Sequence, residues 1–360
     1  MSTIRDRPVA ERVEAANLDC MTDTTTGPLV IRSPQDAIAA VPYLLGFHPA
    51  DSLVAVGFDG PHSTCALRLD LPAHRVSCER TADVLSRNGF RRALVLGYGP
   101  ADAVAPAVAD VWEELTGKGL EVVEALRVAD GRWWSLTCVD SRCCPPEGRP
   151  YDITASAVAA QAVLAGHVAL PGREHLARSV APLEGAVRAA MREATDRAER
   201  RLLAWAREGL SPARIRSRMV EEGVALLTDL SSRERPPDED DVAWLGVLLT
   251  SMRVRDEAWV RIDEAAPGAD IEFWRHVLRR VEEPYVPAPA CLLAFAAFIA
   301  GDGGLANVAL DRAARADPDY TMAALLRDII AAGVPPSKAR LGMTPEDLAR
   351  AYADPDDPDP

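Results

Sequence analysis

The stretch that decides the fold is ALVLGYGPADAVAPAVADVWEELTGKGLEVVEALRV, residues 93–128. Its first six residues form the continuous apolar run that is typical of a strand buried on both faces of a sheet. A Gly-Pro pair then opens a helix over 101–116, glycines at 117 and 119 end it, and 120–128 predicts another strand. Strand, helix and strand in this order predict an α/β sandwich with 93–98 as its central strand.

Flanking segments extend this domain over residues 29–153, as a mixed sheet with flanking helices. Ser33 and Pro34 predict the start of a helix that ends near Val41, before Pro42. The other expected elements are a strand at 29–31, a hairpin of 53–58 and 64–70, a helix at 77–88 and a strand at 132–136. Residues 1–28 lack sustained periodicity, so we expect a disordered tail there.

The C-terminal half predicts an all-α domain of paired helices over residues 154–352. From about residue 154 onward, every long segment has helical periodicity, including an apolar stripe that ends at Trp205. Beyond it, short helices are expected in pairs: 241–252 with 256–265, 269–282 with 289–300, and 304–316 with 320–332. Such pairs favour a superhelical array. Residues 353–360 are acidic and proline-broken and are expected to be disordered.

The composition limits the classes of function. The chain has 360 residues and a net charge of −14, so its average surface repels phosphate, and we expect no nucleic-acid partner. The longest apolar run, 288–300, is too short to cross a bilayer, so we expect no membrane partner. Seven cysteines, an odd and sparse count, and the lack of a secretory signal favour a cytoplasmic location.

Several stretches resemble one family. The sequence VPYLLGFHPADSLV at 41–54 resembles the opening signature of the actinobacterial domain of unknown function 4192 family (DUF4192). Three further stretches are similar to that family's pattern: Trp134-Ser135 with Cys138, CCPPEG at 143–148, and small and apolar residues from Gly301 to Pro318. The resemblance implies no known reaction, cofactor or partner. Residues 289–320 further resemble one tetratricopeptide unit, whose two helices pack through small residues, and such units need neighbours.

The loop at 46–52 is the first candidate site. It carries His48, Asp51 and Ser52 within five residues, and these groups could act as a catalytic base with its orienting acid. The alternative is that Asp51 and Ser52 are ordinary turn residues and that His48 is simply packed.

The second candidate is the cysteine cluster of Cys138, Cys143 and Cys144. Adjacent α-carbons are about 3.8 Å apart, so a disulfide between Cys143 and Cys144 would be strained. Three thiolates with His48 could complete a tetrahedral zinc site, but C-x4-C-C is not the usual pattern of two paired ligands. Reactive thiols and structural cysteines are the alternatives. On the spacing argument we expect no stoichiometric zinc, and we expect no cofactor.

The third candidate is the glycine turn after the central strand, with Gly97 and Gly99. Free amides at the start of the following helix would face an anion or another small ligand. The sequence contains no Walker A loop, no G-x-G-x-x-G after the first strand, no H-E-x-x-H and no G-x-S-x-G. The small ligand itself stays unidentified.

Two functional interpretations follow. The first is a regulatory or protein-interaction module, in which the α/β domain senses a ligand and residues 241–340 bind a protein partner. Trp244, Trp259 and Trp274 are then either buried between helices or include one exposed anchor. The second is an enzyme of unknown reaction, with a site near His48, Asp51 and the Cys143-Cys144 turn. Convergence of those stretches would favour the enzyme.

Overall fold

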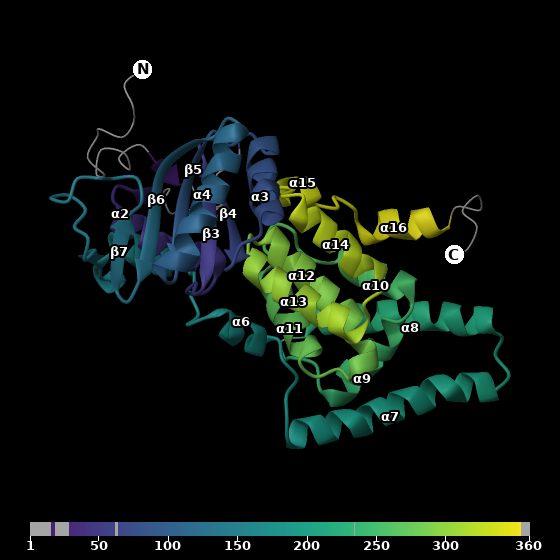
Figure 1. Cartoon of the computed structure of the whole chain (residues 1–360). Helices are drawn as coiled ribbons and strands as arrows, with labels where there is room; N and C mark the ends of the chain where they lie inside the picture. Colours follow the sequence, from purple (N-terminus) through teal and green to yellow (C-terminus); the bar gives the residue numbers. More distant parts are fainter. Residues whose placement is uncertain (1–15, 19–28, 62–63, 234, 354–360) are drawn as a thin grey trace. The chain divides into compact units, whose positions relative to one another are not determined.

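The computed structural model describes residues 16–18, 29–61, 64–233 and 235–353 (Figure 1). The chain divides into two compact units, Met1–Leu176 with Ala331–Pro335, and Ala177–Ile330 with Pro336–Pro360. A mixed sheet with helices forms the first unit and helices alone form the second, which confirms the expected fold class. The first unit extends past residue 153 because α5 (Ala157–Leu164) packs on α2 (Pro34–Leu45).

The sheet of the first unit has six strands in the order β4-β3-β5-β6-β7-β8. The strands are β3 (Ser52–Phe58), β4 (Cys65–Asp70), β5 (Arg92–Tyr98), β6 (Glu121–Ala129), β7 (Arg132–Ser135) and β8 (Arg149–Pro150). Among these six described strands, β5 and β6 alone pair in parallel, and α4 (Ala101–Gly117) connects them. Residues 93–128 therefore form the expected strand–helix–strand unit, and β3 with β4 forms the expected hairpin.

Both faces of the central strands β3 and β5 are buried. α3 (Arg75–Arg87) and α4 cover one face, where Leu53 and Val95 join a hydrophobic core. The alternate residues Val54 and Leu96 point to the opposite face and are at most 1% exposed. Burial on both faces explains why the sequence of the central strand is one continuous apolar run and does not alternate between apolar and polar residues.

The helix α2 continues through Pro42, so the expected end at Val41 was wrong. Proline lacks an amide and removes one bond of the helical ladder. All residues from Ala37 to Pro42 are buried, and we attribute the tolerance of Pro42 to this packing. Gly46, with a φ of 77°, ends the helix in the left-handed conformation that glycine adopts at low cost.

The first turn of α2 provides a stability prediction. Ser33 Oγ accepts a hydrogen bond of 3.2 Å from the Asp36 amide. Ser33→Ala leaves that amide without its cap and should cost about 1 kcal/mol, which is roughly 2–4 °C in the melting temperature of a unit of this size. Calorimetry on the full chain measures it. Ser33→Gly, the control, should cost only a few tenths of a kcal/mol, and a larger loss for glycine than for alanine would contradict the capping role.

One part of the expected N-terminal tail has a described structure. β1 (Ala16–Leu18) pairs antiparallel with β2 (Leu29–Ile31), so the expectation of disorder does not hold for these three residues. Three residues are too few to show a strand period in the sequence. The rest of that tail, and residues 354–360 of the acidic end, lie outside the described residues.

The second unit contains the helices of the C-terminal half. They are α7 (Ala186–Arg207), α8 (Pro212–Ser232), α9 (Glu239–Leu248), α10 (Met252–Val260), α11 (Gly268–Leu278), α12 (Pro287–Ile299), α13 (Gly303–Ala316), α14 (Thr321–Ala331), α15 (Pro336–Ala339) and α16 (Pro345–Tyr352), and α6 (Arg173–Ser179) leads into them. The apolar stripe of α7 is buried at Met191, Ala194, Ala198 and Trp205. Of the helices in the described part of the chain, none is both long and apolar enough to cross a membrane.

Helix packing in this unit centres on α12. All 13 of its residues are buried, and it packs most extensively on α13 and then on α11. The expected pairing of 269–282 with 289–300 is present as the contact between α11 and α12. Within the described helices, the expected pairings of 241–252 with 256–265 and of 304–316 with 320–332 are not extensive contacts, because α13 packs on α12 and both α9 and α10 pack on α8. α12 and α13 span the tetratricopeptide-like stretch, and they bury the small residues Ala297, Ala306 and Ala309. A repeated superhelical array stays a prediction.

Candidate functional site

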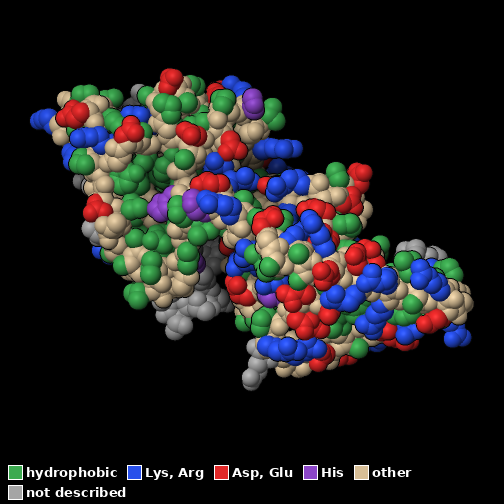
Figure 2. Space-filling model, turned by 90° about the horizontal axis from the view of Figure 1, so that it is seen from below, with side chains coloured by type: hydrophobic (Ala, Val, Ile, Leu, Met, Phe, Trp, Pro, Cys, Tyr) green, Lys and Arg blue, Asp and Glu red, His purple; other side chains and the backbone are tan. Residues whose placement is uncertain are grey.

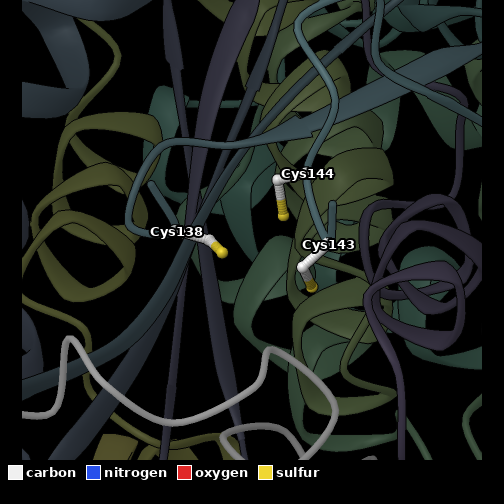
Figure 3. A group of neighbouring side chains, drawn as sticks. All are labelled: Cys138, Cys143 and Cys144. Carbon is white, nitrogen blue, oxygen red and sulfur yellow. The ribbon is translucent and has the colours of Figure 1, made fainter. Parts of the chain in front are cut away.

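Three thiols meet on the turn between β7 and β8. The Sγ atoms of Cys138, Cys143 and Cys144 all lie within 4.8 Å of one another, and all three side chains are half-buried (Figure 3). The amides of Cys143 and Cys144 donate to the same acceptor, the carbonyl oxygen of Asp140, at 3.1 and 2.7 Å. This tight turn brings Cys143 and Cys144 close to Cys138, although four residues separate Cys138 from Cys143 in the sequence.

A buried carboxylate holds the start of this turn. Glu124, on β6, is fully buried, and its Oε1 accepts hydrogen bonds from Ser135 Oγ at 3.0 Å and from Thr137 Oγ1 at 2.5 Å. Ser135 Oγ in turn accepts from the Cys138 amide at 3.0 Å. Sequence reasoning missed Glu124; the available signal was a glutamate inside the otherwise apolar strand run of 120–128.

The far end of the turn is also fixed. Trp134 Nε1 donates to the Pro146 carbonyl at 2.9 Å, and Arg132 Nη1 donates to the Gly148 carbonyl at 2.8 Å. Gly148 has a φ of 76°, and a Cβ there would lie 2.4 Å from the Trp134 ring, so only glycine fits. Hydrogen bonds at both ends therefore hold the cysteines on a constrained turn.

The surroundings of Cys144 favour its protonated thiol. Burial, together with the hydrogen bond that the Cys144 thiol donates to the neighbouring Cys138, raises the pKa of Cys144 to about 12. A thiol with so high a pKa carries little of the nucleophilic thiolate at neutral pH, which weakens the reactive-thiol interpretation for Cys144. Arg149 Nε donates to the Cys143 carbonyl at 2.5 Å, and this guanidinium adds a permanent positive charge to the turn.

The loop with His48 lies on a different part of the sheet. The His48 amide donates to the Leu170 carbonyl at 2.8 Å, and burial lowers the pKa of the imidazole. Asp51 is exposed with a φ of 43°, and the buried Ser52 begins β3. Two strands, β5 and β6, separate β3 from β7, which corresponds to about 14 Å at the usual strand spacing. Among the described residues, the group of converging metal-ligand atoms contains the three cysteines without His48.

The two candidate glycines have structural roles. A Cβ on Gly97 would lie 2.3 Å from Val104 Cγ1, so Gly97 lets α4 pack closely on β5. Gly99 has a φ of 145°, and its amide donates to the Val128 carbonyl at 3.1 Å, so this amide is engaged within the sheet. A Cβ built on Gly99 would lie 3.6 Å from Asp51 Oδ1, so the fold does bring these two candidates together.

Ser52 belongs to a row of buried polar side chains that runs across the sheet. The strand register places Ser52 opposite Tyr98, Tyr98 opposite Val128 and Val128 opposite Trp133, so all four face the same side. Ser52 Oγ, Tyr98 Oη and Trp133 Nε1 are buried and have no hydrogen-bond partner among the described residues. Burial raises the pKa of Tyr98. Such groups usually bind ordered water, so the row is a polar feature of the core.

The tryptophans of the second unit provide no exposed anchor. Trp244 and Trp274 are buried, at 7% and 2% exposure, and the half-buried Trp259 stacks edge-on against Phe295 at 5.4 Å. Trp244 and Trp274 are therefore buried, as one of the two alternatives for these tryptophans stated, and Trp259 is partly buried against Phe295.

The chain thus combines an α/β unit, which carries a constrained thiol turn, with a helical unit. The family profile described as domain of unknown function (DUF4192) matches residues 34–337. The chain belongs to this family, as the resemblance of its motifs implied. No curated protein and no solved structure matches it.

Proposed function

We propose that this protein is a cytoplasmic regulatory protein, in which the α/β unit senses a ligand through the thiol turn and the helical unit binds a protein partner. The observation that carries the proposal is the gathering of Cys138, Cys143 and Cys144 within 4.8 Å on a turn fixed at both ends. Groups held in place by surrounding hydrogen bonds are what a selective binding site requires.

The enzyme alternative has less support. It needs His48 or Asp51 beside the Cys143-Cys144 turn, because a base must lie within hydrogen-bond reach of the proton that it removes. The order of the strands places two strands between these groups instead. The pKa of Cys144 is also raised, whereas a nucleophilic cysteine needs a lowered pKa.

The helical unit supports the partner half of the proposal by its architecture. Stacked helices such as α11, α12 and α13 leave extended faces, and such assemblies commonly bind other proteins. Figure 2 shows side chains of both charge signs interspersed over this unit, which favours a protein partner over a polyanion. An isolated 241–340 fragment would lack α7, whose Trp205 packs edge-on against Trp244 at 5.6 Å, so the test uses the full chain.

The test compares partner capture with free and with blocked thiols. The immobilised full chain, in a Cys20→Ser background, is exposed to native extract before and after treatment with iodoacetamide. We expect at least one partner whose capture changes several-fold, because alkylation fills the turn. The reagent should reach the half-buried turn before the fully buried Cys78 and Cys291.

Two variants serve as controls. Capture by Cys65→Ser should respond to alkylation like the parent chain, because Cys65 lies on β4, outside the turn. Capture by Cys138→Ser/Cys143→Ser/Cys144→Ser should not respond. Capture that is unchanged by alkylation of the parent chain would refute sensing by the turn, and capture of no specific protein in either state would refute the interaction role.

A further inference from the structure

The distances between the thiols suit a single metal ion. Two thiolates, each about 2.3 Å from a tetrahedral zinc ion, lie about 3.8 Å from each other. The three Sγ atoms lie within 4.8 Å of one another. Closing the remaining distance, about 1 Å at most, needs only small side-chain rotations on a backbone that is already in place.

The surroundings of the thiols resemble the outer shell of a metal site. The Cys138 amide donates a hydrogen bond to Ser135 Oγ, and Ser135 Oγ donates one to the fully buried Glu124. These two hydrogen bonds fix the backbone that carries the Cys138 thiol. The Asp140 carbonyl fixes the other two cysteines. Outer-shell partners of this kind orient metal ligands, and their loss typically weakens metal binding by about 10–100-fold.

We propose that Cys138, Cys143 and Cys144 bind one thiophilic divalent cation of the zinc class, and that this ion is the ligand sensed in the function proposed above. Thiolate sulfur selects zinc over magnesium and calcium, which prefer oxygen. Binding converts three thiols to thiolates and releases three protons, so the site with its divalent ion carries a net charge of −1. Arg149, which donates to the Cys143 carbonyl, adds a positive charge to the same turn. The three sulfur atoms fill three corners of the tetrahedron, and water or another donor completes it.

This proposal departs from the expectation based on spacing. The usual zinc pattern has two ligand pairs, each on its own turn. Here one turn carries all three ligands, because the shared bonds to Asp140 fold the Cys-Cys pair back toward Cys138. The distance along the chain is therefore a poor guide to the distance between the sulfur atoms.

The test measures metal binding by the reduced full chain. We expect about one zinc ion per chain by elemental analysis, and Co²⁺ titration of the metal-free protein should produce thiolate-to-cobalt charge-transfer absorption. Cys143→Ser/Cys144→Ser should lose the absorption and the zinc, whereas Cys65→Ser should keep both. Equal melting temperatures of the metal-free variants would show that the double variant is folded. Glu124→Gln, which alters the outer shell alone, should weaken Co²⁺ binding by about 10–100-fold.

Two results would overturn the metal site. One is a reduced chain with all its thiols titratable that gives no charge-transfer absorption with Co²⁺. The other is zinc that remains bound in Cys138→Ser/Cys143→Ser/Cys144→Ser. Metal binding without any effect of the thiols on partner capture would refute the proposed function and leave the metal site standing. Thiol-dependent capture without metal binding would refute the metal site and leave the proposed function standing.

Discussion

Glu257→Ala is expected to destabilise the helical unit by about 3 kcal/mol, because it removes the shared partner of two arginines. Glu257 lies on α10, and its side chain is only 3% exposed. Its Oε2 accepts from Arg253 Nη1 at 2.6 Å, and its Oε1 accepts from Arg261 Nε at 3.1 Å. Arg253 is itself 15% exposed, so the substitution leaves a largely buried charge without its counter-charge.

The measurement is calorimetric unfolding of the full chain, in which the transition of the helical unit should fall by roughly 6–12 °C. The matched control is Glu272→Ala, since Glu272 pairs with Arg275 on α11 but is 71% exposed. An exposed pair contributes at most about 1 kcal/mol. If both variants lost the same stability, burial of the Glu257 network would not determine its contribution.

Gly97→Ala is expected to destabilise the α/β unit by about 1–3 kcal/mol, the usual cost of overpacking a core. The added methyl would lie 2.3 Å from Val104 Cγ1, and both residues belong to the close contact between β5 and α4. Calorimetry again gives the shift of the transition. Gly117→Ala, at the end of α4 with no atom within 4 Å of its Cβ, should be neutral or stabilising.

A second substitution tests the cause. Val104→Ala removes the methyl groups that collide with residue 97, so the double variant Gly97→Ala/Val104→Ala should be more stable than the sum of the single effects predicts. Strict additivity would show that Gly97 acts through something other than this contact. A ligand-binding role for Gly97, by contrast, predicts no coupling to Val104.

The fold was predictable where local signals and tertiary packing agree. The run at 93–98 is apolar on both faces because helices cover one side of β5 and further core residues cover the other, and glycines end the following helix as expected. The extension of α2 through Pro42 was not predictable, because packing of Ala37 to Pro42 outweighs one lost hydrogen bond. The packing of α13 on α12 agrees with the tetratricopeptide resemblance, but the pairing of 304–316 with 320–332 by spacing did not predict it, because spacing along the chain does not state which helices touch.

The candidate site was predictable in its residues and not in its geometry. The sequence singled out Cys138, Cys143 and Cys144, but their convergence depends on hydrogen bonds to the Asp140 carbonyl, which has no sequence signature. Glu124 was overlooked because a glutamate in an apolar strand is usually taken as an exposed position. Gly97 was predicted as a candidate for a small-ligand site, and no signal in the sequence indicated the close packing on Val104 that the structure shows.

The burial of all 13 residues of α12 has a consequence for the folding of this protein during its synthesis. A helix without a polar side is compatible with water only inside its finished surroundings, and the ribosome releases α12 before α13, which covers it. Nascent or prematurely terminated chains that end between these helices therefore present a wholly apolar cylinder. Such chains are substrates for chaperones and proteases, and the helical unit can mature only after its C-terminal helices have been synthesised.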